Sequence, residues 1–253
     1  MHLLGLAFLA GPHITPPGGV TPNLQLLLRW IHFIAGITWV GLLYFFILVN
    51  SPFLKELDAS TRSKVVPLLM PRALWWFRWS SVVTVLAGIW YWMMIVHADA
   101  HNAETSGGRA IWTFFAIWTL AFAAEMGLLM APADFFRKGP VFGIVTGVVV
   151  ALAACLYLGL NSHGWESNRL LAIGVGGGLG WFMMLNVWGI VWRAQKKIIR
   201  WTAESSAQST PMPAEAARLN YLAQLAARTN FVLSFPMLLM MAIASHYPVF
   251  GPP

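Results

Sequence analysis

The sequence predicts an all-α fold, a polytopic integral membrane helix bundle, and three observations lead to this prediction. Of the 253 residues, 58% are hydrophobic and only 10% are charged, so a soluble domain would lack the polar side chains to cover its apolar surface. Several apolar stretches reach about 20 residues, the length that a helix needs to cross a lipid bilayer. Lysine and arginine are concentrated in alternate connections between these stretches.

We expect about six transmembrane helices within a single domain at residues 23–248. An irregular lead-in at 1–22, rich in proline and glycine, precedes this domain, and an uncharged tail at 249–253 follows it. The lead-in contains the apolar run LLGLAFLAG but lacks the basic segment of a secretory signal. The predicted spans are 24–49, 73–97, 109–130, 141–161, 169–193 and 229–247.

The first span carries only two strongly polar side chains, Arg29 and His32, which lie three residues apart and therefore on one helix face. The mixed segment after Pro52, residues 53–72, is expected to form a short surface helix. Tryptophans beside Arg78 open the second span in the manner of an interfacial anchor. The polar loop ADAHNAETSGG then leads to the third span.

Proline and glycine mark the short connection between the third and fourth spans. The fifth span contains the run GVGGGLG, which follows no strand, so a phosphate-binding loop is not expected there. Its glycines recur four residues apart, a spacing that predicts close approach of another helix. The polar segment 194–226 is interpreted as an insert-like loop before the sixth span, which Pro236 is expected to kink.

Basic residues predict the orientation of the bundle. All but three of the 16 lysines and arginines lie in or beside the odd-numbered connections. The positive-inside rule then places those connections in the cytoplasm and both termini outside, as in a bacterial inner membrane. The same bias accounts for the net charge of +7 without a nucleic-acid partner.

Histidines gather at the outer end of this predicted bundle. His97, His163 and His246 end or follow spans on that side, and His32 lies about 12 Å from the outer end of the first span. Imidazoles bind haem iron, copper and zinc, and a b-type haem in a helix bundle needs two that face each other. We predict that His32, with one or more of the other three, binds non-covalent haem b or another metal. The alternative is that histidines at span ends lie at the headgroup boundary.

The single cysteine, Cys155, limits other chemistries. It excludes an internal disulfide, a zinc site built on cysteines and the C-x-x-C-H attachment of a covalent haem c within this chain. Arg29 is expected to pair with a haem propionate or an anionic substrate, or else to reach the outer headgroups.

A second polar set lies toward the cytoplasmic half of the predicted bundle and is expected to form a structural polar cluster. An ion pair between Glu125 and Arg228 would keep both charged groups inside the bundle. Proton uptake through Glu125 is the alternative role. The members of the set are Glu125, Asn186, Arg228 and Asn230.

Four runs resemble the membrane domain of bacterial membrane-bound urate oxidases over roughly residues 24–247. They are RWIHFIAGITWVGLLYFF, PRALWWFRWSS, NVWGIVWRAQKKII and ARTNFVLSFPMLLMMAIASH. In that family, an N-terminal multi-span domain is followed by a periplasmic cytochrome c. No C-x-x-C-H occurs in this chain, so the resemblance implies that electrons leave through a separate cytochrome or another subunit.

Two classes of function follow. The first is a membrane oxidoreductase, with urate as the substrate implied by the resemblance, that passes electrons near the periplasmic face to a separate c-type cytochrome. The second is a non-enzymatic subunit, an anchor or haem b carrier, of a larger respiratory or photosynthetic complex. A transporter is disfavoured, because neither a pair of broken helices nor an inverted repeat is evident.

Overall fold

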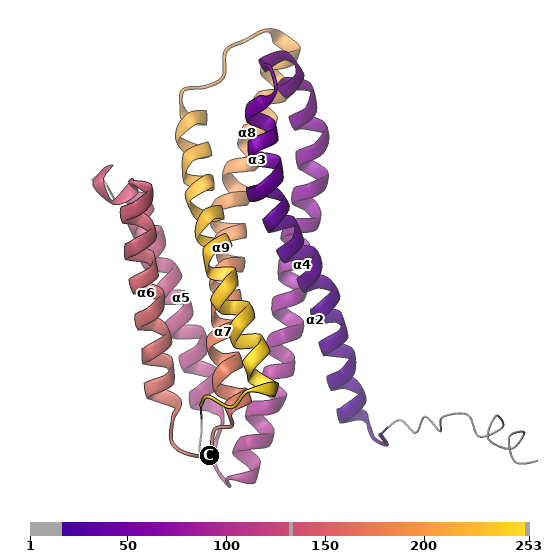
Figure 1. Ribbon diagram of the computed structural model, residues 1–253, viewed down its shortest axis with the longest axis vertical. Coiled ribbons are helices and arrows are strands. Elements are labelled where there is room, and N and C mark those ends of the chain that lie inside the picture. The colour runs from indigo at the N-terminus through magenta and orange to yellow at the C-terminus, as the bar shows by residue number, and fades with distance from the viewer. Residues whose placement is uncertain (1–16, 132–133, 251–253) are drawn as a thin grey trace, which may run out of the picture.

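The computed structural model describes residues 17–131 and 134–250, and every regular element in those residues is a helix. Six helical stretches in that part are long and apolar enough to cross a membrane, so the predicted fold class and number of spans are confirmed. Figure 1 shows them packed side by side along the long axis of the molecule. In chain order the elements are α2 (Val20–Tyr44), η1 (Phe45–Asn50), α3 (Ser51–Glu56), α4 (Ala59–Asn102), α5 (Gly108–Met130), η2 (Asp134–Arg137), α6 (Gly139–Asn161), α7 (Asn168–Asn186), η3 (Val187–Val191), α8 (Trp192–Gln208) and α9 (Glu215–His246).

The helices are longer than the predicted spans at one end of the bundle. With 44 residues, α4 is about 66 Å long, roughly twice the thickness of a bilayer core. Segment 53–72 belongs to α3 and the first turns of α4, and segment 194–226 belongs largely to α8 and α9. The interpretation of 194–226 as a loop was therefore wrong. Its apolar residues recur at helical spacing, and α8 packs against both α4 and α9.

The two ends of the bundle, at the top and bottom of Figure 1, carry different residues. One end, where α3 meets α4 and α8 meets α9, we call the basic end; it carries Lys55, Arg62, Lys64, Lys196, Lys197 and Arg200. The other, where α4, α6 and α9 terminate, we call the histidine end; it carries His97, His163 and His246. The predicted segregation of basic residues and histidines to opposite ends agrees with this arrangement, and the orientation across the membrane stays a prediction.

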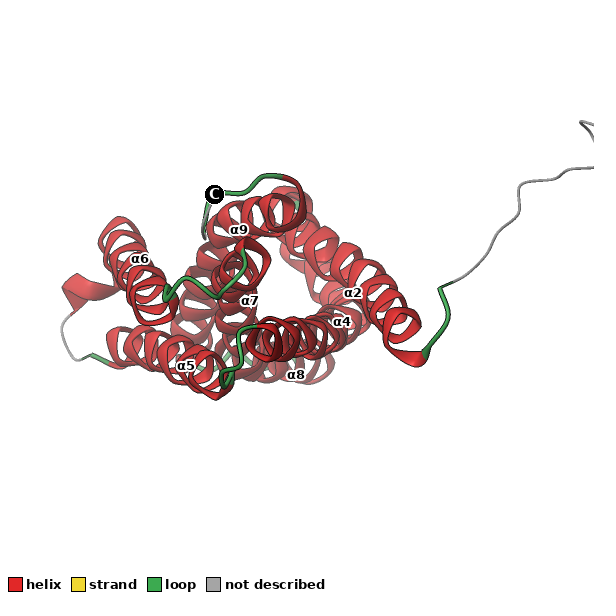
Figure 2. Ribbon diagram, turned by 90° about the horizontal axis from the view of Figure 1, so that it is seen from below, coloured by secondary structure: helices red, strands yellow, loops and turns green. Residues whose placement is uncertain are grey.

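Helix α7 lies at the centre of the bundle. Figure 2 shows it between the pair α5 and α6 on one side and the pair α2 and α4 on the other, with α9 alongside. Its glycines permit this position: Gly174 lies against Tyr157 of α6, Gly178 against Trp118 of α5, and Gly176 against Met240 of α9. The predicted close packing on the GVGGGLG run is thus confirmed, although large side chains rather than a second backbone fill the space beside Gly174 and Gly178.

Replacing Gly178 with alanine should destabilise the bundle, because the added methyl group would overlap the buried Trp118 indole. Overpacking of this kind costs about 1–3 kcal/mol. The measurement is the unfolding midpoint of the purified protein in detergent. Gly147→Ala is the matched control, because a Cβ on that glycine of α6 meets nothing within 4 Å. Equal midpoints for the two variants would contradict the packing described for α7.

Candidate functional site

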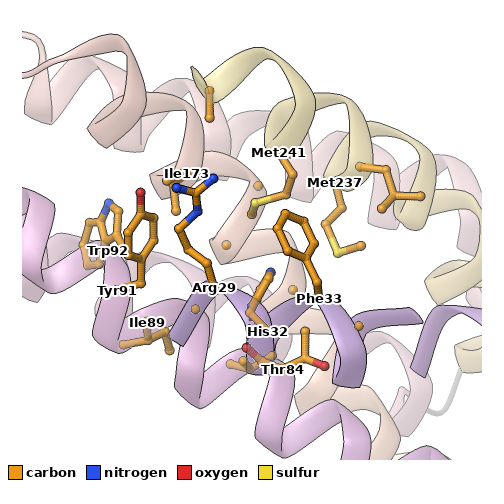
Figure 3. Close-up of a pocket in the computed structure, with 18 of the residues that line it drawn as sticks. Arg29, His32, Phe33, Thr84, Ile89, Tyr91, Trp92, Ile173, Met237 and Met241 are labelled. Atoms are coloured by element: carbon orange, nitrogen blue, oxygen red, sulfur yellow. Dashed lines mark hydrogen bonds between the residues drawn. The ribbon is translucent and has the colours of Figure 1, made fainter. Parts of the chain in front are cut away.

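A cavity of about 390 Å³ lies between α2, α4, α7 and α9, toward the histidine end of the bundle (Figure 3). Most of its wall is apolar. Glycines on three of the helices line it, namely Gly36 and Gly41 of α2, Gly88 of α4, and Gly176, Gly177 and Gly180 of α7. At Gly36, Gly41, Gly177 and Gly180 an added Cβ would meet no atom closer than 3.6 Å, so these four leave open volume.

His32 is the polar group held most firmly at this cavity. Its Nδ1 lies 2.8 Å from the backbone oxygen of Thr84 on α4. A carbonyl oxygen only accepts hydrogen bonds, so Nδ1 carries the proton and donates it. Nε2 therefore keeps its lone pair, and Figure 3 shows the ring extending from α2 into the cavity on the side of Met237 and Met241. A ring nitrogen fixed in this way is how proteins orient histidines that ligate metals.

Gly88 explains how α2 and α4 come close enough for that hydrogen bond. A Cβ at this position would lie 2.7 Å from Nδ1 of His32 and 2.8 Å from its Cε1, which is closer than atoms in contact can approach. The imidazole thus occupies the space that any other residue at position 88 would fill. Placement of His32 depends on a glycine 56 positions further along the chain.

Arg29 places a positive charge beside the same cavity. It precedes His32 by three residues on α2, and its guanidinium lies 5.9 Å from the centre of the Tyr91 ring. Figure 3 shows it on the side of the cavity formed by Tyr91 and Trp92. No carboxylate of the described residues forms an ion pair with it. The charge is therefore available to an anionic group that enters the cavity.

The structure brings two of the four predicted histidines to this cavity. His246, the last residue of α9, lines it together with His32. His97 is exposed and stacks on His101, with ring centres 6.4 Å apart, and His163 pairs with the buried carboxylate of Glu166 at 2.9 Å. No cluster of three or more histidine, cysteine, aspartate or glutamate residues suited to a metal occurs in the part of the chain that is described.

Two methionines line the cavity that the sequence analysis did not single out. Met237 and Met241 lie four residues apart on α9, hence on one face of that helix, and both reach the cavity wall. Thioether sulfur is a soft ligand for haem iron and copper. The signal was present in the sequence, because both methionines share a helix with His246, but only histidines were considered as ligands.

The second polar set assembles differently from the prediction. Asn186 Nδ2 donates to Asn230 Oδ1 at 3.0 Å, so these two meet as expected. The ion pair between Glu125 and Arg228 does not form: Arg228 is exposed, and both carboxylate oxygens of the buried Glu125 are without a partner. The reason is angular, because Arg228 and Asn230 are two residues apart on α9 and so face directions roughly 200° apart.

Comparison with known proteins adds one finding. A family model described as urate oxidase N-terminal matches residues 20–251, a range that contains all six membrane helices and the whole cavity. No curated protein and no solved structure matches the chain.

Replacing Gly88 with alanine should push the His32 ring away from the Thr84 carbonyl, because the new Cβ takes its place. Losing a hydrogen bond of about 1 kcal/mol should speed modification of His32 by diethyl pyrocarbonate about fivefold. Mass spectrometry of the labelled protein gives the rate at that residue. Gly41→Ala, also in the cavity wall but with nothing within 4 Å of an added Cβ, should leave it unchanged. A Gly88→Ala rate equal to wild type would contradict the assigned geometry.

Proposed function

Because the chain belongs to the urate oxidase N-terminal family, we propose that it is a membrane-embedded redox domain that passes electrons at its histidine end to a separate c-type cytochrome. The observation that carries this proposal is the His32 imidazole, held by the Thr84 carbonyl with its Nε2 lone pair free at the wall of a largely apolar cavity. The chain itself holds no C-x-x-C-H. An acceptor with covalent haem would thus be a different polypeptide or lie outside these residues.

We infer non-covalent haem b as the cofactor, and the residues present fit it. His32 would hold the iron through Nε2, and Thr84 would keep that nitrogen unprotonated by accepting the hydrogen of Nδ1. The second axial position would fall to His246 or to one of the methionines, Met237 or Met241, which line the same cavity. Haem b, when bound, supplies one-electron oxidation and reduction.

The remaining wall residues would bind and shield the group. Arg29 would pair with one anionic group at the side of Tyr91, either a carboxylate of the haem or an anionic substrate, because no carboxylate of the described residues neutralises it. Glycines on α2 and α7 leave room for a flat ligand between the helices. Trp39 and Trp92, both almost fully buried, exclude water from the inner side.

At the histidine end, hydrogen bonds to one asparagine hold the segment that follows α9. Asn168 Oδ1 accepts hydrogen bonds from the backbone nitrogens of Val249 and Phe250, at 2.8 and 2.9 Å. Its Nδ2 donates to the carbonyls of Ile243 and Ala244 at the end of α9. The first two bonds anchor the segment after His246 against the start of α7, and the other two anchor the last turn of α9 there. A cytochrome that docks at this end would therefore lie beside the side of the bundle that holds the cavity.

Urate is the substrate that the family name suggests, and the cavity offers an anionic molecule of that kind one cationic contact, Arg29. In the proposed reaction, urate is oxidised at the histidine end by two electrons and releases two protons, and the electrons reduce two one-electron c-type haems in turn. Arg29 would orient the anion, and the neutral Nε2 side of His32 would face the redox group rather than the substrate.

The first test is the visible spectrum of the purified protein, oxidised and reduced with dithionite. We expect the bands of a b-type haem in the wild type and their loss in His32→Ala, because an iron ligand has been removed. His97→Ala is the matched control, since His97 stacks on His101 and does not line the cavity. Full haem content in His32→Ala would remove His32 as the ligand and with it the basis of the proposal.

The second test is the rate at which urate reduces an added c-type cytochrome. Wild-type protein should support this reaction, and Arg29→Gln should slow it about tenfold or more, the effect of losing a hydrogen bond to a charged group. A haem-containing protein that reduces no cytochrome with urate would instead be a haem b carrier within a larger respiratory or photosynthetic complex.

A further inference from the structure

Glu125 of α5 is a buried carboxyl group without a partner. Its side chain is 0% exposed, and neither Oε1 nor Oε2 has a hydrogen bond. It lies five residues before the end of α5 at Met130, within a helix that spans the membrane. An ionised carboxylate in such a place has neither water nor a counter-charge, so the neutral, protonated acid is the favoured form.

The surrounding amides are ordered by one backbone carbonyl. Asn230 Nδ2 donates to Met183 O at 2.9 Å, and this oxygen can only accept. Asn230 Oδ1 therefore faces Asn186, whose Nδ2 donates to it at 3.0 Å. Asn186 adjoins Glu125, and its Oδ1 has no partner. Three oxygens thus lack a hydrogen bond, two on Glu125 and one on Asn186, and the only amide hydrogen left beside them is the second one on Asn186 Nδ2.

One amide hydrogen cannot serve three oxygens, so the cluster requires a further hydrogen that its own amides do not supply. We propose that Glu125, Asn186 and Asn230 form a proton-binding site inside the membrane, at which the Glu125 carboxyl takes up and releases a proton. In the protonated state the acid supplies the missing donor, and the amide pair holds Asn186 in place to accept it. The site is separate from the cavity at His32, because none of its three residues lines that cavity.

Access to this site is provided from the basic end. A surface hollow of about 490 Å³ is lined by residues of α5, α7, η3 and α8. Phe122 in its wall precedes Glu125 by three residues, and Gly189 follows Asn186 by three, so the wall lies about one helical turn from both. Arg193 and Lys196, both exposed, give the lining two cationic groups.

Two features of η3 suit a passage between the hollow and the site. Val187–Val191 is a π-helix that begins directly after Asn186, and such bulges are frequent at functional sites. Within it, Gly189 lies so close to Phe122 that a Cβ there would be 2.8 Å from the ring Cζ. The edge of one aromatic ring, which can rotate, thus closes the hollow at the position of the glycine.

No other ionisable side chain described on the elements around α5 forms a hydrogen bond or ion pair with Glu125. Arg78 of α4 lies over the Trp192 ring at 3.8 Å, and Arg228 of α9 is exposed. No further histidine, cysteine or carboxylate completes a metal site among the described residues, and a hard cation needs about six oxygens. The remaining ionisable side chains described on α5 and the elements that contact it do not bond Glu125 either. They are Arg62, Lys64, Arg72, Tyr91, His97, Asp99 and His101 of α4, Arg109 of α5, Cys155 and Tyr157 of α6, and Arg169 of α7.

Infrared spectroscopy of the full chain in lipid vesicles tests the proposal. We expect the C=O band of a protonated carboxylic acid that is lost in Glu125→Gln and shifts when the vesicles are moved to deuterium oxide. Glu166→Gln is the matched control, because Glu166 is equally buried but its carboxylate accepts hydrogen bonds from His163. It should leave the band unchanged.

Two results of this experiment would overturn the proposal. A band unaffected by Glu125→Gln would mean that Glu125 is ionised, and a band that never shifts in deuterium oxide would mean a sealed structural acid. The neutral-carboxyl reagent dicyclohexylcarbodiimide gives an independent readout: it should label Glu125 in the wild type. Protection from labelling by sodium ions at constant pH would reassign the site to a metal cation. None of these readouts needs a bound cofactor, so they stand apart from the tests at His32.

The route is tested separately with Gly189→Val. This change should fill the space at Phe122 and slow the deuterium shift, while the band itself is retained. Gly127→Val on the exposed side of α5, where a Cβ meets nothing within 4 Å, should leave the rate at the wild-type value. Equal rates in the two variants would rule out entry through the hollow.

Discussion

The arrangement of the bundle depends on how closely other helices approach α7. A glycine on a membrane helix costs little where the surroundings are already dry, and it lets a neighbour come within reach of dispersion contacts that lipid would otherwise make. On one side of α7, Gly174 and Gly178 receive Tyr157 and Trp118. On the other side, Gly176 brings α9 close, while Gly177 and Gly180 open onto the cavity. One run of small residues thus sets both the packing and the empty space.

Much of the fold could be predicted because the bilayer imposes it. Backbone groups in lipid must bond within their own segment, so apolar stretches of sufficient length become helices and their number follows from composition. Outside its own thickness the bilayer does not constrain the backbone, and the prediction was wrong for a segment of that kind. Residues 194–226 are polar enough for a loop, yet they form α8 and the start of α9. Those residues are helical because α8 packs on α4 and α9, a long-range contact that no local pattern reveals.

The sequence predicted how far along the bundle axis each histidine lies, but not which way its side chain points. Counting residues from a span end places His32, His97, His163 and His246 near one end, as the structure has them. Which way a ring faces depends on the rotation of its helix about the helix axis. A single sequence predicts this rotation only where polar residues mark one face of the helix over several turns. His97 and His163 therefore meet nearby polar groups instead of the cavity. The same rotation separates Arg228 from Asn230, and it leaves Glu125 without the partner expected for it.

Helix α9 contributes to both polar centres through one stripe of its surface. Asn230, Ser234, Met237 and Met241 follow at intervals of four, three and four residues, which keeps them on one face. Asn230 belongs to the Glu125 cluster, Ser234 bonds the Tyr44 hydroxyl of α2 at 3.0 Å, and the methionines line the cavity. Two sites are energetically coupled when both of them bias the equilibrium of a shared element between two conformations. Pro236 lies in that interval and cannot donate to the carbonyl four residues earlier, so α9 can bend there at the lowest cost in hydrogen bonds.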